Sequence, residues 1–364
     1  MLSLGDDERS LMRALRLLDW KSEPVLQEID QPEPGPGQVV IAVGGAGACH
    51  SDLHLMEDFE PGALPWNPPF TLGHENAGWV QSLGEGVANL EVGQPVAVYG
   101  PWGCGRCVRC LAGFETYCED LASATVPGGG GGLGADGGMA DYMLIPHARF
   151  LVPLPEGLDP AAAAPLTDAA LTPYHAIKRS LPKLAADSYA VVIGVGGLGQ
   201  MGVQILRAMS GATVVAVDTR AEALQVAETD GADYTFLSDD TTAEQIREVT
   251  GGRGADVIID CVGVDATLAM GAAAARQMGD LTIVGIGGGT LPVSFFSIPY
   301  EVSVQTTYWG SRQDLVEVLN LGGRGLIGSR VATYSLDEAV SAYEALKSGD
   351  IEGRAVVVPN EKMP

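Results

Sequence analysis

The chain has little positive charge and no long hydrophobic run. Its 364 residues include 21 Lys and Arg against 46 Asp and Glu, which gives a formal net charge of −25. This balance repels phosphate backbones and anionic membranes over a Debye length of about 8 Å in physiological salt. The sequence also lacks the roughly 18 consecutive apolar residues of a membrane span and the basic-then-apolar layout of a signal peptide. We therefore expect a cytoplasmic protein that binds neither nucleic acid nor a membrane.

The chain is too long for one hydrophobic core, and its texture changes along its length. Up to about residue 166, short strands alternate with Gly and Pro, a pattern typical of a β-rich, barrel-like domain. Further on, strands alternate with helices, which predicts a doubly wound parallel sheet with strands at residues 189–193, 213–217, 234–237, 256–261, 281–285 and 302–306.

The predicted α/β chain has three segments. Residues 12–168 form the β-rich domain, residues 169–308 form the parallel-sheet domain, and residues 309–364 return to the first domain. A helix is expected over residues 159–179, and residues 1–11, which carry no pattern, are interpreted as an extension outside the fold. The return segment is expected to hold helices at residues 311–321 and 336–347 and a strand at residues 354–358.

A cysteine and a histidine follow predicted strands in the first domain. Cys49 opens the run Cys-His-Ser-Asp-Leu-His directly after an apolar strand, and His74 stands between Gly73 and Glu75. Thiolate and imidazole are both good ligands for zinc. Taken alone, such a pair is more often a buried thiol and a hydrogen-bonded histidine than a metal site.

Four further cysteines lie within one short segment. Cys104, Cys107, Cys110 and Cys118 are spaced so that a short loop curls their thiols around one centre. Four thiolates in a tetrahedron are typical of structural zinc. Disulfides are disfavoured inside cells, and an iron–sulfur cluster is a further alternative for four thiolates. The segment over residues 103–118 is therefore predicted to be a zinc lobe.

A glycine-rich motif follows the first strand of the parallel sheet. Gly194, Gly196 and Gly199 form Gly-x-Gly-x-x-Gly at the point where a strand gives way to a helix, and Asp218 ends the next strand. This context is typical of a dinucleotide site, in which backbone amides bind the pyrophosphate and the acid binds the adenosine ribose. An acid at this place repels a 2′-phosphate, so NAD is favoured over NADP, although Arg220 could weaken that preference. A second glycine run, residues 128–132, is expected to be a mobile loop.

With these motifs in order, residues 12–358 resemble the zinc-dependent alcohol dehydrogenases of the medium-chain dehydrogenase/reductase superfamily. The resemblance implies a GroES-like catalytic domain and a Rossmann cofactor domain, with NAD and two zinc ions per chain. It implies that Cys49, His74 and Asp168 bind the catalytic zinc, although the third ligand in this family is usually Cys. The lobe cysteines would bind the structural zinc.

The resemblance also assigns roles around the metal. Asp52 would orient the histidine ligand. This role is also expected on physical grounds, because the second ring N–H of a metal-bound histidine needs a hydrogen-bond acceptor. Glu75 would lie behind the metal, and Ser51 and His54 would relay the proton. The residues implied to contact the cofactor are His50, Gly194, Gly196, Gly197, Leu198, Gly199, Asp218 and Arg354.

Four large side chains, Trp66, Leu133, Tyr308 and Trp309, resemble residues that line the substrate cleft. They imply an apolar pocket for secondary or aryl-alkyl alcohols and the matching ketones or aldehydes, in a dimer or tetramer. The alternatives are a polyol or amino-alcohol dehydrogenase, a zinc-free quinone reductase and a non-catalytic NAD-binding protein. The zinc-free enzyme would have no use for Cys49, His74 and the lobe thiols.

Overall fold

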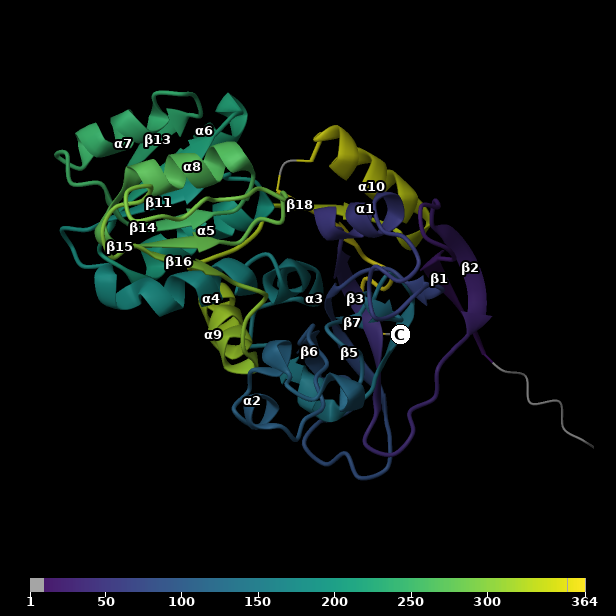
Figure 1. The fold of residues 1–364 in the computed structure, drawn as a ribbon. Helices are drawn as coiled ribbons and strands as arrows, with labels where there is room; N and C mark the ends of the chain where they lie inside the picture. The colour runs from purple at the N-terminus through teal and green to yellow at the C-terminus, as the bar shows by residue number, and fades with distance from the viewer. Residues whose placement is uncertain (1–9, 352, 364) are drawn as a thin grey trace, which may run out of the picture. The chain divides into compact units, whose positions relative to one another are not determined.

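The computed structural model describes residues 10–351 and 353–363, which divide into two compact units (Figure 1). Unit 1 comprises the described residues of Met1–Asp168 and Arg330–Pro364, and unit 2 is Ala169–Ser329. The extension predicted at residues 1–11 lies outside the described residues except for Ser10 and Leu11, and Leu11 begins the first strand. No helix in the described part of the chain is long and apolar enough to cross a membrane.

Unit 1 is built around a sheet whose central strand is wholly buried. Within the described residues, the strand order is β10-β6-β5-β3-β18-β17, with β9 also paired to β3. All nine residues of β3 are buried, as expected for a run of Val, Ile, Ala and Gly with strands on both sides. The strands of this sheet are β3 (Val39–Gly47), β5 (Glu75–Leu83), β6 (Pro95–Val98), β9 (Tyr142–Ile145), β10 (Leu151–Pro153), β17 (Val331–Tyr334) and β18 (Arg354–Val357).

Smaller elements complete unit 1. A second sheet has the order β2-β1-β4, and two very short strands, β7 and β8, pair with each other. The bounds of these strands are β1 (Leu11–Leu17), β2 (Val25–Asp30), β4 (Phe70–Thr71), β7 (Gly130–Gly131) and β8 (Gly134–Ala135). The helices are α1 (His50–Glu57), α2 (Val108–Leu111), α3 (Pro160–Ala163) and α10 (Ala339–Ser348), with 3-10 turns that include η4 (Ala164–Thr167) and η6 (Leu336–Glu338).

Unit 2 confirms the predicted doubly wound sheet. Its strands are parallel and, in the described chain, run in the order β13-β12-β11-β14-β15-β16. The order reverses between β11 and β14, and ligands of such sheets bind where the strand order reverses. The strands are β11 (Tyr189–Ile193), β12 (Thr213–Asp218), β13 (Tyr234–Leu237), β14 (Ala255–Asp260), β15 (Ala275–Ile283) and β16 (Ser303–Thr306). The helices are α4 (Leu171–Ser180), α5 (Gly197–Met209), α6 (Ala221–Thr229), α7 (Thr242–Val249), α8 (Asp265–Ala274) and α9 (Arg312–Gly323).

The continuous helix predicted over residues 159–179 is broken in the structure. The chain passes from α3 through η4 and leaves helical geometry at Asp168, where φ is −136° and ψ is −59°. Pro165 contributes to this break, because its ring cannot continue an α-helix and it has no N–H to donate. The break releases the Asp168 side chain from a helical face.

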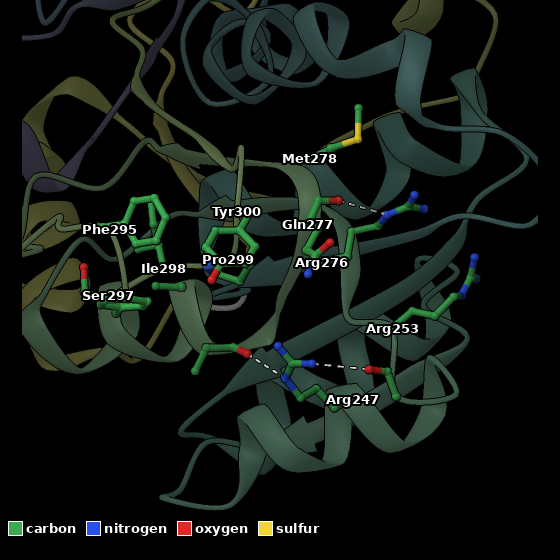
Figure 2. A pocket seen from close by; sticks show the side chains of 14 residues that line it. Arg247, Arg253, Arg276, Gln277, Met278, Phe295, Ser297, Ile298, Pro299 and Tyr300 are labelled. Atoms are coloured by element: carbon green, nitrogen blue, oxygen red, sulfur yellow. Dashed lines mark hydrogen bonds between the residues drawn. The ribbon is translucent and has the colours of Figure 1, made fainter.

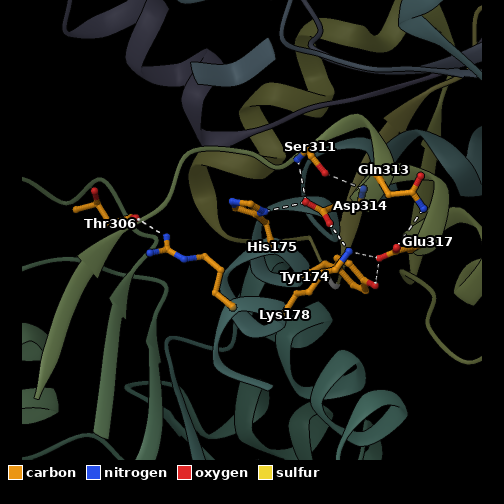
Figure 3. Close-up of polar contacts among 9 residues, drawn as sticks. Tyr174, His175, Lys178, Thr306, Ser311, Gln313, Asp314 and Glu317 are labelled. Carbon is orange, nitrogen blue, oxygen red and sulfur yellow. Dashed lines mark hydrogen bonds and ion pairs between the residues drawn. The ribbon is translucent and has the colours of Figure 1, made fainter. Parts of the chain in front are cut away.

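The return to the first domain comes later than the predicted residue 309. Helix α9 still belongs to unit 2, where it packs on α4 (Figure 3). Asp314 on α9 accepts hydrogen bonds from His175 Nδ1 at 2.8 Å and Lys178 Nζ at 2.8 Å, both on α4. These polar contacts tie α9 to unit 2, and the chain re-enters unit 1 at Arg330.

Candidate active site

Strand register brings the first predicted metal ligands together. In the antiparallel pairing of β3 with β5, Gly47 lies opposite Glu75. Cys49 stands two residues beyond Gly47 and His74 stands one residue before Glu75, so both reach the same end of the sheet. Gly47 is needed there, because a Cβ on it would come within 2.0 Å of Glu75 Oε2.

The four donor residues form one compact cluster. Donor atoms of Cys49, His74, Glu75 and Asp168 all lie within 4.8 Å of one another. His74 Nε2 lies 3.6 Å from Asp168 Oδ2, close to the roughly 3.4 Å edge of a tetrahedron with metal bonds of about 2.1 Å. Asp168 reaches the cluster because η4 contacts β3, β5 and β18 before the chain breaks. The structure therefore brings together all three residues predicted to bind the catalytic zinc.

Asp52 fixes the other side of the histidine ring. It is fully buried on α1, and its Oδ1 lies 3.0 Å from His74 Nδ1. Its Oδ2 accepts a hydrogen bond from the Cys49 backbone N–H at 3.1 Å. The ring is therefore held between Asp52 on Nδ1 and Asp168 on Nε2, which leaves Nε2 as the nitrogen that faces the cluster.

Arg354 is predicted to contact the cofactor pyrophosphate, and the structure adds a second partner for it. The residue is buried and forms an ion pair with Glu75. The register explains this, because Val356 of β18 pairs with Gly47, which places Arg354 beside Glu75. Burial raises the pKa of the Glu75 carboxyl, and the Arg354 guanidinium opposes that rise. Arg354 thus supports a carboxylate behind the cluster.

The donor atoms of this cluster fit a divalent cation. Burial works against the charged ring of His74, but Asp52, Asp168 and Cys49 outweigh it and raise its pKa well above the ordinary value. Surroundings that hold a proton so firmly also favour a cation. Glu75 Oε2 is buried and has no hydrogen-bond partner among the described residues. A sulfur, a nitrogen and carboxylate oxygens are the donors that zinc takes.

The four lobe cysteines form a second cluster. All six cysteines of the chain are free, and the sulfurs of Cys104, Cys107, Cys110 and Cys118 lie within 4.8 Å of one another. The 3.8 Å between Cys104 Sγ and Cys110 Sγ matches a tetrahedral edge for metal–sulfur bonds of about 2.3 Å and excludes a disulfide between them. Backbone N–H groups lower the pKa of Cys107 to about 6, which favours the thiolate that zinc needs.

The glycine run at residues 128–132 is not a loose linker, contrary to the expectation of a mobile loop. Gly130 and Gly131 are buried and form β7. A Cβ on Gly132 would lie 2.4 Å from Gly73 O and 2.8 Å from His74 N, so the run packs against the backbone of a predicted ligand. Glycine is required at residue 132 also because its φ is +80°.

The predicted relay residues lie on α1. Ser51 Oγ is 3.6 Å from Cys49 Sγ. The His54 side chain is 43% exposed, and its Nδ1 lies 2.5 Å from Asp58 Oδ2, so the ring stands where a proton can pass to water. His50 is exposed as the first residue of the helix.

The predicted dinucleotide loop has the expected local geometry in unit 2. Gly194 turns the chain with φ +80°, and a Cβ on Gly199 would lie 2.0 Å from Gly194 O. Gly196 caps α5 and has open space around its Cα, while Gly197 and Leu198 begin the helix. Asp218 Oδ2 accepts a hydrogen bond from Val195 N at 2.8 Å, which ties the loop to the end of β12.

The four predicted pocket residues fall in both units. In unit 1, the Trp66 ring packs against Gly134, on which a Cβ would lie 2.5 Å from it, and half-buried Leu133 directly precedes that glycine. In unit 2, Tyr308 is exposed and Trp309 is buried, with ring centroids 5.6 Å apart. Each pair is therefore local to its own unit.

A hollow of about 770 Å³ on unit 2 contains none of the predicted site residues. Figure 2 shows Phe295 and Tyr300 on one side of it and Arg253 on the other. Arg247 donates to the carbonyls of Ala273 and Gly252, and Arg276 pairs with Asp256. The arginines of this hollow therefore hold the protein backbone and its own carboxylates.

Comparison with known proteins agrees with this site. Residues 35–156 match the alcohol dehydrogenase GroES-like domain, and residues 197–323 match the zinc-binding dehydrogenase family. The NAD-dependent alcohol dehydrogenase of Sulfurisphaera tokodaii is 35% identical over 96% of this chain and all of its own. The chain belongs to the zinc-binding alcohol dehydrogenases of the medium-chain superfamily.

Other zinc-binding dehydrogenases also match this chain over nearly its whole length. The alcohol dehydrogenase structure of Aeropyrum pernix has 35% identity and a TM-score of 0.86, and covers 95% of this chain and all of its own. D-arabinose 1-dehydrogenase (NADP+) of Saccharolobus solfataricus is 34% identical over 94% of this chain and 97% of its own. The family therefore includes similar members with different substrates and cofactors.

One buried neighbour of the donor cluster in this zinc-binding alcohol dehydrogenase is not marked by any sequence motif. Tyr343 on α10 donates its hydroxyl hydrogen to Asp52 Oδ2 at 2.9 Å. Nothing around Tyr343 in the sequence marks it, because it stands in an ordinary helical pattern. The two residues are 291 positions apart, so only the fold reveals the contact.

Proposed function

We propose that this chain is an NAD-dependent alcohol dehydrogenase that oxidises secondary or aryl-alkyl primary alcohols to ketones or aldehydes, with one catalytic and one structural zinc. The observation that carries the proposal is the buried cluster of Cys49, His74 and Asp168, with His74 held between two carboxylates. Three protein donors with a position left for substrate are typical of catalytic zinc, whereas four thiolates are typical of structural zinc.

In this proposal, bound zinc supplies the Lewis acidity that lowers the pKa of the alcohol, and NAD supplies the acceptor for its hydride. Cys49, His74 and Asp168 hold the metal. Asp52 keeps the His74 ring in place by accepting its Nδ1–H, since a metal-ligating histidine usually donates its other N–H to a carboxylate. Glu75 stands behind the cluster in an ion pair with Arg354, whose guanidinium balances its negative charge.

The chain's own side chains also provide a route for the alcohol proton. The Ser51 hydroxyl lies beside the cluster, where it would accept the alcohol proton while passing its own proton on toward His54, and the ribose of a bound cofactor would lie between the two residues. The exposed His54 releases it at the surface beside Asp58, whose carboxylate holds the ring in position. His50 is proposed to contact the cofactor.

Asp218 supports NAD as the preferred cofactor. Its carboxylate stands at the end of β12 and is anchored by backbone N–H groups of Val195 and Arg220, so its negative charge is fixed in place. A 2′-phosphate would be repelled there. Arg220 Nε lies 3.7 Å from Asp218 Oδ1, which reduces the repulsion without removing it. We expect Asp218→Ala to lower the NAD-over-NADP ratio of kcat/KM about tenfold.

The substrate class rests on the apolar side chains of Trp66, Leu133, Tyr308 and Trp309. A polyol or sugar dehydrogenase is the second candidate, favoured by the similarity to the D-arabinose enzyme. Initial rates with NADH across aryl ketones, aliphatic ketones, aldehydes and sugars or their ketoses would separate the two. Faster turnover of sugars than of every ketone would contradict the proposed substrate class.

Metal analysis tests the rest of the proposal. The purified chain is expected to retain about two zinc ions after dialysis, and removal of both is expected to abolish turnover. Fewer than one zinc per chain, with full activity, would contradict the metal-dependent mechanism. Light scattering would test the proposed dimer or tetramer.

A further inference from the structure

The buried carboxylate of Asp52 receives more donors than the histidine alone requires. His74 lies against its Oδ1, and Cys49 N–H and Tyr343 O–H both donate to its Oδ2. Asp52 is 0% exposed and Tyr343 is 4% exposed, so water does not substitute for either partner. A buried carboxylate that loses one donor bears the full cost of that loss.

Tyr343 can act only as the donor in this contact. Burial and the charge of Asp52 raise the pKa of the Tyr343 phenol well above its ordinary value. The phenol therefore keeps its proton, and the 2.9 Å contact is a hydrogen bond to an ionised carboxylate.

The contact also links two distant parts of unit 1. Tyr343 belongs to α10 in the return segment, whereas Asp52 belongs to α1 directly after Cys49. The same two helices are joined at the surface by Lys347 Nζ and Glu57 Oε1, 2.5 Å apart. Helix α10 is thus docked on α1 by one exposed ion pair and one buried hydrogen bond.

We infer that Tyr343 is a positioning residue for the catalytic metal: its hydroxyl fixes Asp52, and through Asp52 it fixes His74 and the Cys49 backbone. The inference rests on the metal site of the proposed function and extends it to a residue of the C-terminal helix. Loss of the hydroxyl leaves Asp52 able to shift, so the His74 ring is held less firmly. Mutation of a residue that hydrogen-bonds a metal ligand from behind typically lowers metal affinity by about 10-fold to 100-fold.

The test uses the full-length holoenzyme and Tyr343→Phe, which removes only the hydroxyl. The release of zinc to a chromophoric chelator is followed over time, and each zinc site is expected to give its own kinetic phase. The phase that is absent from Cys49→Ser is assigned to the buried cluster, and the remaining phase is assigned to the cysteine lobe. We expect Tyr343→Phe to release that zinc about tenfold faster, with the lobe zinc unchanged. When cobalt replaces zinc in the buried cluster, the visible absorption bands of the cobalt in Tyr343→Phe should be shifted from those of the wild type.

Two controls make the result decisive. Lys347→Ala breaks the exposed contact of the same helices and should leave zinc release within about twofold of the wild type, since exposed pairs contribute little. In an Asp52→Asn background, Tyr343→Phe should add little, because the hydrogen bond then ends on a neutral amide that no longer controls the histidine.

The outcomes distinguish the inference from the function on which it rests. Folded Tyr343→Phe with wild-type zinc release and cobalt spectrum would overturn the inference alone. Equal acceleration in Lys347→Ala would also overturn it, since loosened helix docking would then explain the effect. If the wild type holds no metal at Cys49 and His74, the proposed function itself fails.

Discussion

Unit 1 contains two donor clusters that are built in opposite ways. The lobe cluster takes four sulfurs from one short loop, and three of its cysteines are partly exposed. The other cluster takes a sulfur from just after β3, a nitrogen and a carboxylate from the start of β5, and a second carboxylate from the end of η4, and three of its four residues are buried. Four thiolates from one loop are typical of a structural zinc site. A mixed set of donors brought together by several strands is typical of a catalytic zinc site.

The sharpest test of this comparison is Cys49→Ser. A serine hydroxyl is a poor zinc ligand at neutral pH, so the buried cluster should lose its metal and turnover should fall by more than about 1000-fold. NAD binding should persist, because the loop and Asp218 belong to unit 2. Metal content, steady-state rates and NADH fluorescence measure the three effects.

Cys261→Ser is the control for that change. Cys261 lies outside both clusters, and the substitution should leave zinc content unchanged and turnover within about threefold. Wild-type turnover in Cys49→Ser would show that the buried cluster is not the reaction centre.

Cys107→Ser tests the opposite half of the comparison. No donor of the buried cluster comes from residues 103–118, so turnover before heating should stay within about threefold. Loss of the lobe metal should lower the temperature of half-inactivation by on the order of 10 °C, because metal binding contributes directly to folding. Residual activity after heating measures this effect.

Arg106→Ala is the matched control in the same loop. It removes an exposed ion pair with Asp120 but keeps the backbone N–H that faces Cys104 Sγ, so the inactivation temperature should move by only about 2 °C or less. A large loss of kcat in Cys107→Ser at low temperature would instead place the lobe in catalysis.

The glycine run offers a smaller test of how the buried cluster is supported. Gly132→Ala should lower kcat by about tenfold, because its Cβ would push on Gly73 and on the backbone of His74. Gly128→Ala is the control, since φ is positive there too but no atom lies within 4 Å of the added Cβ. Equal losses in both variants would attribute the effect to backbone strain alone.

The same contrast explains what could be predicted from sequence. The lobe and the Gly194–Gly199 loop are local, so the spacing of their residues predicts their geometry, and the parallel sheet follows from alternating elements. The ion pair of Arg354 with Glu75 depends on the register of β18 against β3, which no local pattern specifies. Tyr343 and Gly132 contact the site through tertiary packing, so their sequence neighbours carry no trace of it.

The α4–α9 contact in unit 2 resembles the buried donor cluster of unit 1, but an ammonium group lies where that cluster is proposed to hold a metal. His175 Nδ1 lies 2.8 Å from Asp314, as His74 Nδ1 lies 3.0 Å from Asp52, yet the next cation is Lys178 Nζ (Figure 3). We therefore expect Asp314→Asn to affect stability without affecting zinc content, costing about 2 kcal/mol.

The pH dependence of that cost tests the assignment. Burial alone would raise the pKa of Asp314, but hydrogen bonds from His175, Lys178 and Ser311 outweigh burial and lower it. Because the folded pKa lies below the unfolded value of about 3.9, the stabilisation is complete above that value and is lost as pH falls toward the folded pKa. In urea unfolding, the difference between wild type and Asp314→Asn should thus be constant from about pH 5.5 to 7.5 and should shrink below about pH 4. A difference that grew toward acid pH would show that the Asp314 carboxylate does not stabilise this contact.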